Sequence, residues 1–158
     1  MGTVIARNTI NQLREQLKHE KKKIVFTNGC FDILHRGHIE YIAKAKQLGD
    51  VLFIGVNSDS SCRRIKGEKR PIVPEDDRAF LLSSLLFVDY VVLFDEDTPA
   101  NIIKEILPDV LVKGADWSKK NIVGKDVVEA NGGAVATIDF VPNRSTTNIV
   151  ERILERYR

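Results

Sequence analysis

The sequence predicts an α/β fold in which about five parallel strands form one doubly wound sheet with helices on both faces. Short apolar runs alternate regularly with segments whose apolar residues recur at helical spacing. The apolar runs are continuous, which is typical of strands that are covered on both faces. Polar clusters follow the strands, and open α/β sheets bind ligands at the carboxyl ends of their strands. We therefore expect the functional site at that edge of the sheet.

The chain is expected to begin with an N-terminal helix and a basic lead-in over residues 1–22, followed by one domain over residues 23–158. Ile10, Leu13 and Leu17 fall on one helical face. The basic run after this helix is interpreted as a solvated helix end. A chain of 158 residues is long enough for one domain with a proper core and too short for two large ones.

The first expected strand of the domain, residues 24–28, leads into the stretch around which the chain is organised. Residues 27–38 read Thr-Asn-Gly-Cys-Phe-Asp-Ile-Leu-His-Arg-Gly-His and lead into a segment of helical spacing. Free N–H groups and the helix dipole favour anions at such a helix start. His35 and His38 can donate hydrogen bonds to a phosphate, and Gly37 lets the backbone approach a ligand. The alternative is a pair of capping or buried histidines.

The least regular stretch, residues 60–74, follows an expected helix at 38–48 and an expected strand at 51–56. It is rich in arginine and lysine, Lys66 among them, and it contains glycine and proline. We expect a mobile flap that closes positive charge over phosphates. A solvated excursion of the chain is the alternative.

An acidic run that begins at Glu75 indicates a helix start, because negative charge complements the helix dipole there. The apolar positions of this helix that are expected to be buried are Phe80, Leu81, Leu85 and Val88. Arg78 lies in the first turn, where a cation is unfavourable for the dipole. Its position indicates that it serves a ligand or an acidic partner.

The second half of the chain continues the alternation. Strands are expected at 90–94, 110–112 and within 134–140, and helices at 98–107 and 126–130. A last helix is expected to bury Ile149, Val150, Ile153 and Leu154. Ser145 and Thr146 stand where this helix begins, so their hydroxyls and free N–H groups could bind phosphates. A plain N-cap is the alternative for Ser145.

Composition and charge exclude several classes of function. A net charge of +2 is too small for a surface devoted to nucleic acid. No apolar run approaches the roughly 20 residues of a membrane span, and no leader of secretory type is expected. Cys30, Cys62 and three scattered histidines have no metal-site spacing. We therefore expect a cytoplasmic protein with free thiols that acts on small anionic molecules.

Two motifs carry a resemblance to a known family. His35-Arg36-Gly37-His38, after Gly29-Cys30-Phe31-Asp32, resembles the HxGH signature of the cytidylyltransferase-like nucleotidyltransferases. Ser145-Thr146-Thr147-Asn148-Ile149 resembles the C-terminal Ser-Thr-Thr motif of the glycerol-3-phosphate cytidylyltransferases and their relatives. Across nearly the whole chain, the order of motifs is most similar to the adenylyltransferase part of the bifunctional heptose-phosphate kinase/adenylyltransferases. The lead into the second motif, Val141 to Arg144, departs from the Arg-Thr-x-Gly-Ile of the cytidylyltransferases and weakens a cytidylyl assignment.

The resemblance implies a Rossmann-like fold and transfer of AMP from ATP to D-glycero-D-manno-heptose 1-phosphate. Pyrophosphate would leave, and ADP-heptose for lipopolysaccharide or a related glycan would form. Mg²⁺ would be held mainly by the triphosphate. A homodimer and a separate heptose-phosphate kinase are the expected partners. The alternatives are a cytidylyltransferase for glycerol 3-phosphate or another small alcohol phosphate, and a non-catalytic nucleotide-binding regulator.

The resemblance also assigns roles to residues. The expected catalytic residues are His35, His38, Lys66 and Arg78. The expected nucleotide- and phosphate-binding residues are Thr27, Asn28, Gly29, Phe31, Gly37, Gly114, Asp116, Ser145, Thr146 and Thr147. The expected acceptor-binding residues are Asp32, Asp59, Lys66 and Arg144. No protein ligands to a metal are expected, although Asp32 is a plausible carboxylate near the phosphates.

Overall fold

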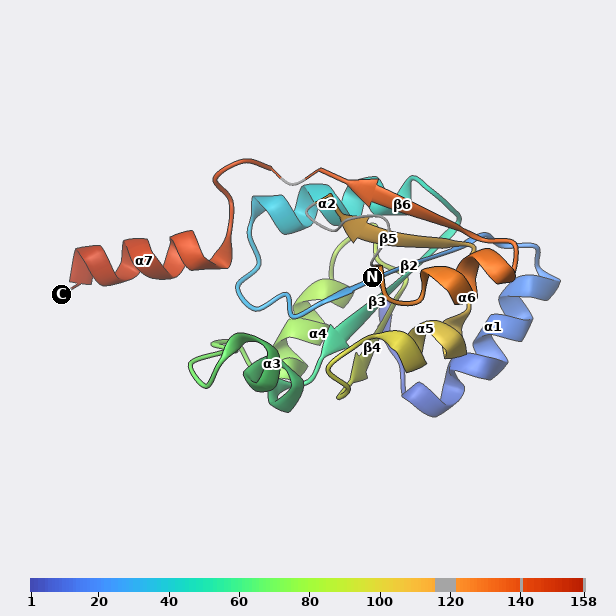
Figure 1. Cartoon of the computed structure of the whole chain (residues 1–158), viewed down its shortest axis with the longest axis horizontal. Helices are drawn as coiled ribbons and strands as arrows, with labels where there is room; N and C mark the ends of the chain where they lie inside the picture. Colours follow the sequence, from blue (N-terminus) through green and yellow to red (C-terminus); the bar gives the residue numbers. More distant parts are fainter. Residues whose placement is uncertain (116–121, 140, 158) are drawn as a thin grey trace.

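The computed structural model describes residues 1–115, 122–139 and 141–157, which contain one six-stranded sheet (Figure 1). The strands are β1 (Thr3–Val4), β2 (Ile24–Gly29), β3 (Val51–Asn57), β4 (Tyr90–Phe94), β5 (Val110–Gly114) and β6 (Ala134–Ile138). Their order is β1-β4-β3-β2-β5-β6, and every neighbouring pair is parallel. The doubly wound parallel sheet is confirmed. β1, which pairs with β4, was not predicted, because two residues are too few to show a period.

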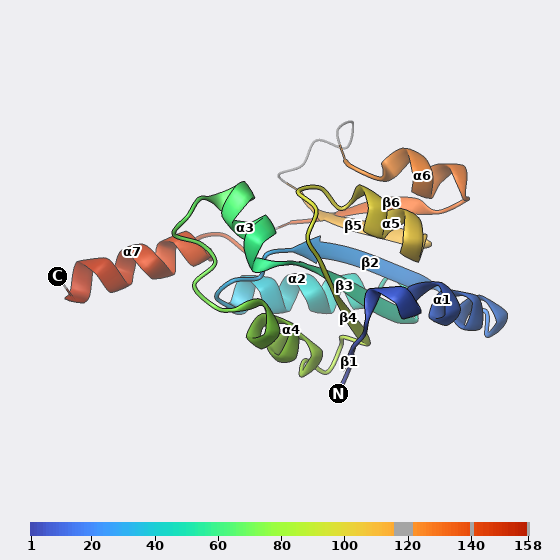
Figure 2. The ribbon, with the colours of Figure 1, turned by 90° about the horizontal axis from the view of Figure 1, so that it is seen from below.

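Helices cover both faces of the sheet, as continuous apolar strands require. They are α1 (Ile10–His19), α2 (Arg36–Lys46), α3 (Asp59–Lys66), α4 (Glu75–Ser83), α5 (Ala100–Ile106), α6 (Lys125–Ala130) and α7 (Thr146–Tyr157), with a short 3₁₀ turn at Arg7–Thr9. α5 and α6 lie on one side of the sheet, and α2 and α4 lie on the other (Figure 2). The strands therefore contribute side chains to two separate cores.

Two apolar clusters form these cores. Phe26 and Phe53, which are register partners on β2 and β3, belong to the first cluster with residues of α1, α5 and α6. Val25 and Leu52, the preceding partners, belong to the second cluster with residues of α2 and α4. Ile10 and Leu17 of α1 are buried in the first cluster, as their spacing predicted. Residues 1–22 thus share a core with the sheet.

The expectation of an irregular stretch at 60–74 is wrong for its first half, because α3 occupies residues 59–66. The Ser58 side chain caps this helix by accepting a hydrogen bond from the Ser61 N–H. The helix carries few apolar residues, so a periodicity argument missed it. The candidate flap shortens to residues 67–74.

Two expectations about buried helix positions are also wrong. In α4, Phe80 is 59 % exposed and Leu81 is 44 % exposed. The buried stripe is Arg78, Ala79, Leu82 and Ser83. This stripe has helical spacing, but it includes a charged residue whose hydrogen bonds are all made internally, and a hydrophobicity pattern does not reveal such a residue.

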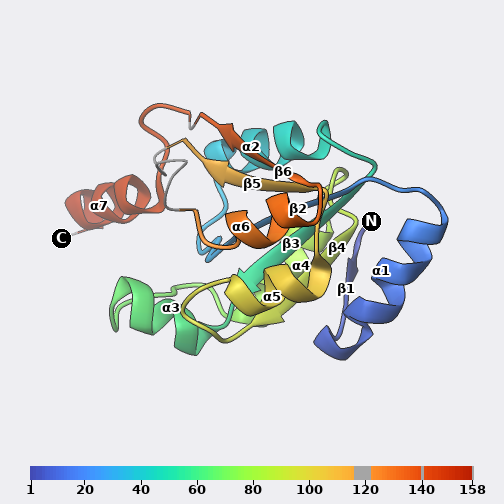
Figure 3. The same cartoon turned by 45° about the vertical axis from the view of Figure 1, so that its right-hand side comes forward.

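α7 extends away from the sheet (Figures 1 and 3). Within its described residues only Thr146 is buried, and Ile153 and Leu154 are about half exposed. The expectation that both would be buried is wrong, because no element of the described chain covers that side of the helix. In the ranges that the structure describes, no helix is both long and apolar enough to cross a membrane.

Candidate active site

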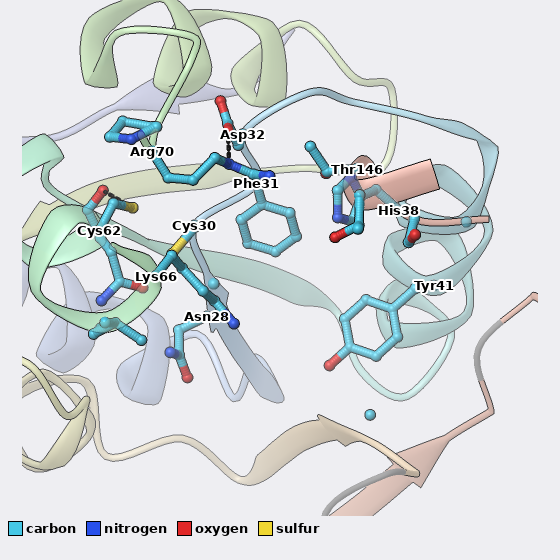
Figure 4. Close-up of a pocket in the computed structure, with 18 of the residues that line it drawn as sticks. Asn28, Cys30, Phe31, Asp32, His38, Tyr41, Cys62, Lys66, Arg70 and Thr146 are labelled. Atoms are coloured by element: carbon cyan, nitrogen blue, oxygen red, sulfur yellow. Dashed lines mark hydrogen bonds and ion pairs between the residues drawn. The ribbon is translucent and has the colours of Figure 1, made fainter. Parts of the chain in front are cut away.

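A cavity of about 700 Å³ opens at the carboxyl ends of the strands, where the sequence places it (Figure 4). β2 and β5 are neighbours in the sheet, and the chain leaves them toward opposite edges. Such a switch point leaves a crevice above the strand ends. The cavity lies there, bordered by the loop after β2, the first turns of α2 and α7, and the end of α3.

The two histidines form one unit at the start of α2. His35 is the N-cap, and its Nδ1 accepts a hydrogen bond of 3.1 Å from the Gly37 N–H. The neutral His35 ring therefore carries its proton on Nε2, where it can donate to a ligand. The His35 and His38 rings stack with centroids 3.9 Å apart. A Cβ at position 37 would lie 3.0 Å from the His35 ring, so glycine gives this close approach the room it needs.

Phe31 supports the pair from the other side. Its ring meets the His38 ring edge-on, with centroids 5.3 Å apart. Phe31 has a φ of 49°, in the left-handed region that bulky residues rarely adopt. A Cβ at Gly29 would lie 3.2 Å from the Phe31 ring. The loop after β2 therefore stores backbone strain at the site, which is common where a side chain must be held in one place.

Both imidazoles are held in the neutral form. Burial, and then the neighbouring His35, lower the pKa of His38 to about 4, while Asp32 opposes the shift. Burial also lowers the pKa of His35. Among the described residues the buried Nδ1 of His38 has no hydrogen-bond partner. A bound polyanion would raise the pKa of both imidazoles. The histidine pair can therefore take up protons when such a ligand binds.

Lowering the pH from about 7 to about 5 is expected to destabilise the fold through His38. Between the ordinary pKa of 6.5 and the folded value of about 4, the unfolded chain binds a proton that the folded chain does not. The stability present above pH 6.5 is thus lost as the pH falls through the folded pKa. The His38→Asn variant lacks this titrating group. Between pH 7 and pH 5, its unfolding free energy should therefore rise relative to that of the wild type by up to about 2 kcal/mol. Urea denaturation at both pH values measures the shift, and a constant difference would contradict the lowered pKa.

Lys113, on β5, is a site residue that the sequence reasoning missed. Its ammonium donates to the Asn28 Oδ1 across the switch point. Burial lowers the pKa of Lys113 to about 8. In the part of the chain that the structure describes, no carboxylate forms an ion pair with it. A partly buried cation without a carboxylate partner, lining a cavity, favours an anionic ligand. The only signal in the sequence is a lysine directly after an apolar strand run.

Asp32 anchors the loop at 67–74. Its side chain is 2 % exposed, and one oxygen accepts hydrogen bonds of 2.8 Å from the N–H groups of Ile72 and Val73. The other accepts one of 2.5 Å from the Arg70 Nε (Figure 4). Asp32 and Arg70 both line the cavity, but both oxygens of the Asp32 carboxylate already accept hydrogen bonds from the loop at 67–74.

Arg78 is fully buried and lies outside the described lining of the cavity. It donates to the carbonyl oxygens of Cys30 and Val73 and, at 2.7 Å, to the Asp59 carboxylate. Asp59 is therefore the acidic partner that the position of Arg78 in the helix indicated. Together they tie the loop after β2, the loop before α4 and the start of α3 into one frame. Lys66, in contrast, lines the cavity directly.

The remaining predicted residues divide between the cavity and other places. The cavity is lined by Asn28, Gly29, Phe31, Gly37, Gly114, Arg144, Ser145, Thr146 and Thr147. Thr27 points into the core, where its hydroxyl hydrogen-bonds the Tyr41 hydroxyl at 2.7 Å. Ser145 accepts a hydrogen bond of 3.1 Å from the Asn148 N–H, which is the geometry of the plain N-cap alternative. Asp116 and Trp117 lie outside the described residues.

Besides Lys113, the cavity is lined by residues to which the sequence reasoning assigned no individual role. They are Cys30, Tyr41, Asn57, Cys62, Ile65, Arg70, Pro71, Asp97, Thr98, Pro99 and Val123. Asn57 ends its strand as Asn28 does, so position at a strand end was an available signal. Arg70 belongs to the basic stretch at 60–74 that was expected to lie over phosphates. Cys62 reaches the cavity because α3 lies over the strand ends, which spacing along the chain does not reveal.

Comparisons with known proteins agree with this arrangement. A model of the cytidylyltransferase-like family matches residues 26–152. The bifunctional protein HldE of Campylobacter concisus is 59 % identical over 92 % of this chain and 30 % of its own length. That of Syntrophotalea carbinolica is 53 % identical over 96 % of this chain and 31 % of its own length. The chain thus spans about a third of the length of these relatives.

Two solved structures share the fold. The lipopolysaccharide core biosynthesis protein from Thermoplasma volcanium matches with a TM-score of 0.63 and 32 % identity over 76 % of this chain and 97 % of its own. The pantoate-β-alanine ligase from Francisella tularensis, complexed with β-γ ATP and β-alanine, matches with a TM-score of 0.64 over 98 % of this chain and 80 % of its own. Its 16 % identity supports a shared fold alone.

Proposed function

This chain belongs to the cytidylyltransferase-like family, and from that premise we propose that it is a sugar-phosphate adenylyltransferase. It transfers AMP from ATP to D-glycero-D-manno-heptose 1-phosphate, releases pyrophosphate and forms ADP-heptose for lipopolysaccharide or a related glycan. The identity of more than half of the aligned residues with bifunctional HldE proteins supports this substrate pair. The observation that carries the reaction class is the stacked histidine pair at the start of α2, which shares the cavity with the Lys113 ammonium at the switch point.

The reaction needs positioning and charge neutralisation rather than a strong base. An oxygen of the acceptor phosphate, already anionic, attacks the α-phosphorus of ATP, and the bond to the pyrophosphate oxygen breaks in line. Negative charge grows on the α-phosphate and on the leaving pyrophosphate, so preorganised donors stabilise the transition state. We assign this work to the Nε2–H groups of His35 and His38 and to the ammonium groups of Lys66 and Lys113. Thr146, buried at the start of α7, offers its backbone N–H to the far end of the triphosphate.

Magnesium is proposed to enter with ATP, bound mainly by phosphate oxygens. Across the described ranges no group of three or more His, Cys, Asp or Glu side chains could hold a metal ion. Asp32 has both oxygens engaged with the loop at 67–74. The ion neutralises phosphate charge, and the residues of this chain bind the phosphates and orient them for in-line attack.

Arg78 is assigned a positioning role in place of direct phosphate contact. Its guanidinium donates to protein acceptors, and these hydrogen bonds hold the loop that leads to the histidines against α3 and the segment before α4. Asp59 shares this role, because its carboxylate balances the buried guanidinium.

Replacing Lys113 by methionine is expected to lower kcat/KM by roughly 10- to 100-fold. The substitution removes one charge-assisted hydrogen bond to a phosphate and keeps the length of the side chain. Lys113→Arg, the matched control, keeps the charge and should retain more activity than the methionine variant. Steady-state pyrophosphate release at varied ATP and acceptor concentrations measures both. Equal kcat/KM for Lys113→Met and the wild type would remove Lys113 from the site.

Pyrophosphate release across a grid of four nucleoside triphosphates and a panel of phosphorylated acceptors tests the assignment. The expected result is activity with ATP and heptose 1-phosphate. Activity only with CTP and glycerol 3-phosphate would overturn the substrates and leave the reaction class standing. Tight nucleotide binding without turnover on any acceptor would favour a non-catalytic regulator.

The proposed substrate also defines the partners. A kinase activity must supply the heptose 1-phosphate, either on a separate polypeptide or on the same one. We further propose a homodimer, supported by exposed apolar side chains on α4 and α7 such as Phe80 and Leu154, and light scattering tests it. Free thiols and a nucleotide substrate support a place in the cytoplasm.

A further inference from the structure

Two cysteines from different segments meet in the substrate cavity. Cys30 lies in the loop after β2, and Cys62 lies in α3. Both are free thiols; Cys30 is half-buried and Cys62 is fully buried. Nothing in the proposed phosphoryl chemistry uses a thiol. The pair is therefore a nucleophilic cluster without an assigned task, inside the site itself.

The surrounding frame holds the two sulfurs toward each other. Both side chains line the cavity, Figure 4 places them in the part next to Lys66, and each thiol shifts the pKa of the other. The Cys62 Sγ also donates to the Asn57 carbonyl oxygen at 3.7 Å, which fixes its direction. The Cys30 carbonyl accepts a hydrogen bond from Arg78, which fixes the loop. The approach of the thiols is thus built into the fold.

The electrostatics divide the pair into two chemically different thiols. The neighbouring Cys62 thiol, and after it the positive charges of Lys66, Arg78 and Arg70, lower the pKa of Cys30 against the effect of burial. The neighbouring Cys30 and burial raise the pKa of Cys62. Of the two thiols, Cys30 therefore becomes a thiolate more readily, and an accessible thiolate is the reactive form of cysteine. Cys62 stands beside it as a resolving thiol.

We propose that Cys30 and Cys62 form a peroxide-sensitive dithiol that closes to a disulfide within the substrate cavity. The Cys30 thiolate attacks one oxygen of hydrogen peroxide, the O–O bond breaks, and a sulfenic acid and hydroxide form. The Cys62 thiol then attacks the sulfenic sulfur, an S–S bond forms, and water leaves. With one proton taken up by the hydroxide, one peroxide yields one disulfide and two waters. The two sulfurs lose two electrons, and the peroxide oxygens gain them.

Formation of the disulfide changes the geometry of the substrate cavity. An S–S bond is about 2.05 Å long, so its formation draws the loop after β2 and α3 toward each other. The first segment leads into the histidine pair, and the second ends at Lys66. We therefore expect oxidation to displace phosphate-binding groups and to inhibit nucleotidyl transfer reversibly. This inference goes beyond the proposed function, because disulfide formation is measured without any substrate.

The test exposes the full chain to graded hydrogen peroxide near neutral pH. Free thiols are then blocked, and the protein is digested without reductant for mass spectrometry. The wild type should lose both thiols together and yield a peptide pair joined through Cys30 and Cys62. Dithiothreitol should restore the thiols and the activity that peroxide removed. Each protein is compared with its own untreated sample.

Cys62→Ser and Cys62→Ala are the matched controls, and circular dichroism identifies which of the two folds. Without the resolving thiol, Cys30 should pass to sulfinic acid, and dithiothreitol should not restore it. In Cys30→Ser, Cys62 should stay reduced, because it is buried and its pKa is raised. Two free thiols in peroxide-treated wild type would overturn the proposal. A Cys62 variant that is inactivated and rescued like the wild type would also overturn it.

Discussion

Replacing Asp32 by alanine is expected to lower the free energy of unfolding by about 3–5 kcal/mol, the scale of removing one partner from a buried ion pair. The Asp32 carboxylate holds the N–H groups of Ile72 and Val73 and the guanidinium of Arg70. Alanine leaves two backbone donors and one largely buried cation without this acceptor. Urea denaturation followed by fluorescence measures the loss.

The matched control is Asp97→Ala. Asp97 also pairs with an arginine, Arg64, but its side chain is 60 % exposed. An ion pair at such a surface contributes about 1 kcal/mol or less, because water and salt screen it. Asp32→Asn, which keeps an acceptor oxygen and loses the charge, should fall between the two. A loss for Asp32→Ala no greater than that for Asp97→Ala would show that the loop at 67–74 does not depend on Asp32.

Replacing His38 by alanine is expected to lower kcat by roughly 10²–10³-fold, the effect of removing one preorganised donor at developing charge. His38 stacks on His35 and lines the cavity where the triphosphate is proposed to bind. The fold should survive, because His38 lies at the edge of the cavity and the apolar clusters do not include it. Single-turnover pyrophosphate release at saturating ATP isolates the chemical step from substrate binding.

His19→Ala is the control for this experiment, because His19 is exposed at the end of α1, remote from the cavity. Its turnover should equal that of the wild type. A folded His38→Ala protein with wild-type turnover would remove His38 from the mechanism and leave its stacking with His35 as its only role.

The sheet was predictable because its signal is local. A strand such as β3, which is apolar from Val51 to Val56, indicates burial on both faces without knowledge of its neighbours. The histidine pair was also predictable, since His35 and His38 lie within one turn of each other at a strand-to-helix junction. The parallel sheet was therefore predictable from short-range pattern, and the family resemblance added the expected roles of the histidines.

The parts that sequence reasoning missed depend on contacts between distant segments. Lys113 meets Asn28 only through the pairing of β5 with β2. Thr27 was expected in the site together with Asn28, but adjacent strand residues point to opposite sides, and Thr27 faces the core. Arg78 is buried in spite of its charge because three separate segments supply its acceptors. The periodicity of apolar residues along the sequence does not reveal such long-range contacts.

α7 has a consequence for how stability is distributed along the chain. A helix of 12 residues is marginal in water by itself, and only the first turn of α7 is anchored, through Thr146. The later turns add little to either core, so they can fray in a subglobal opening that leaves the sheet intact. In the monomer, amide protons of residues 150–157 should therefore exchange with solvent much faster than those of β2 and β3. The chain thus separates a cooperative unit, centred on the sheet, from a terminal segment with its own low opening free energy.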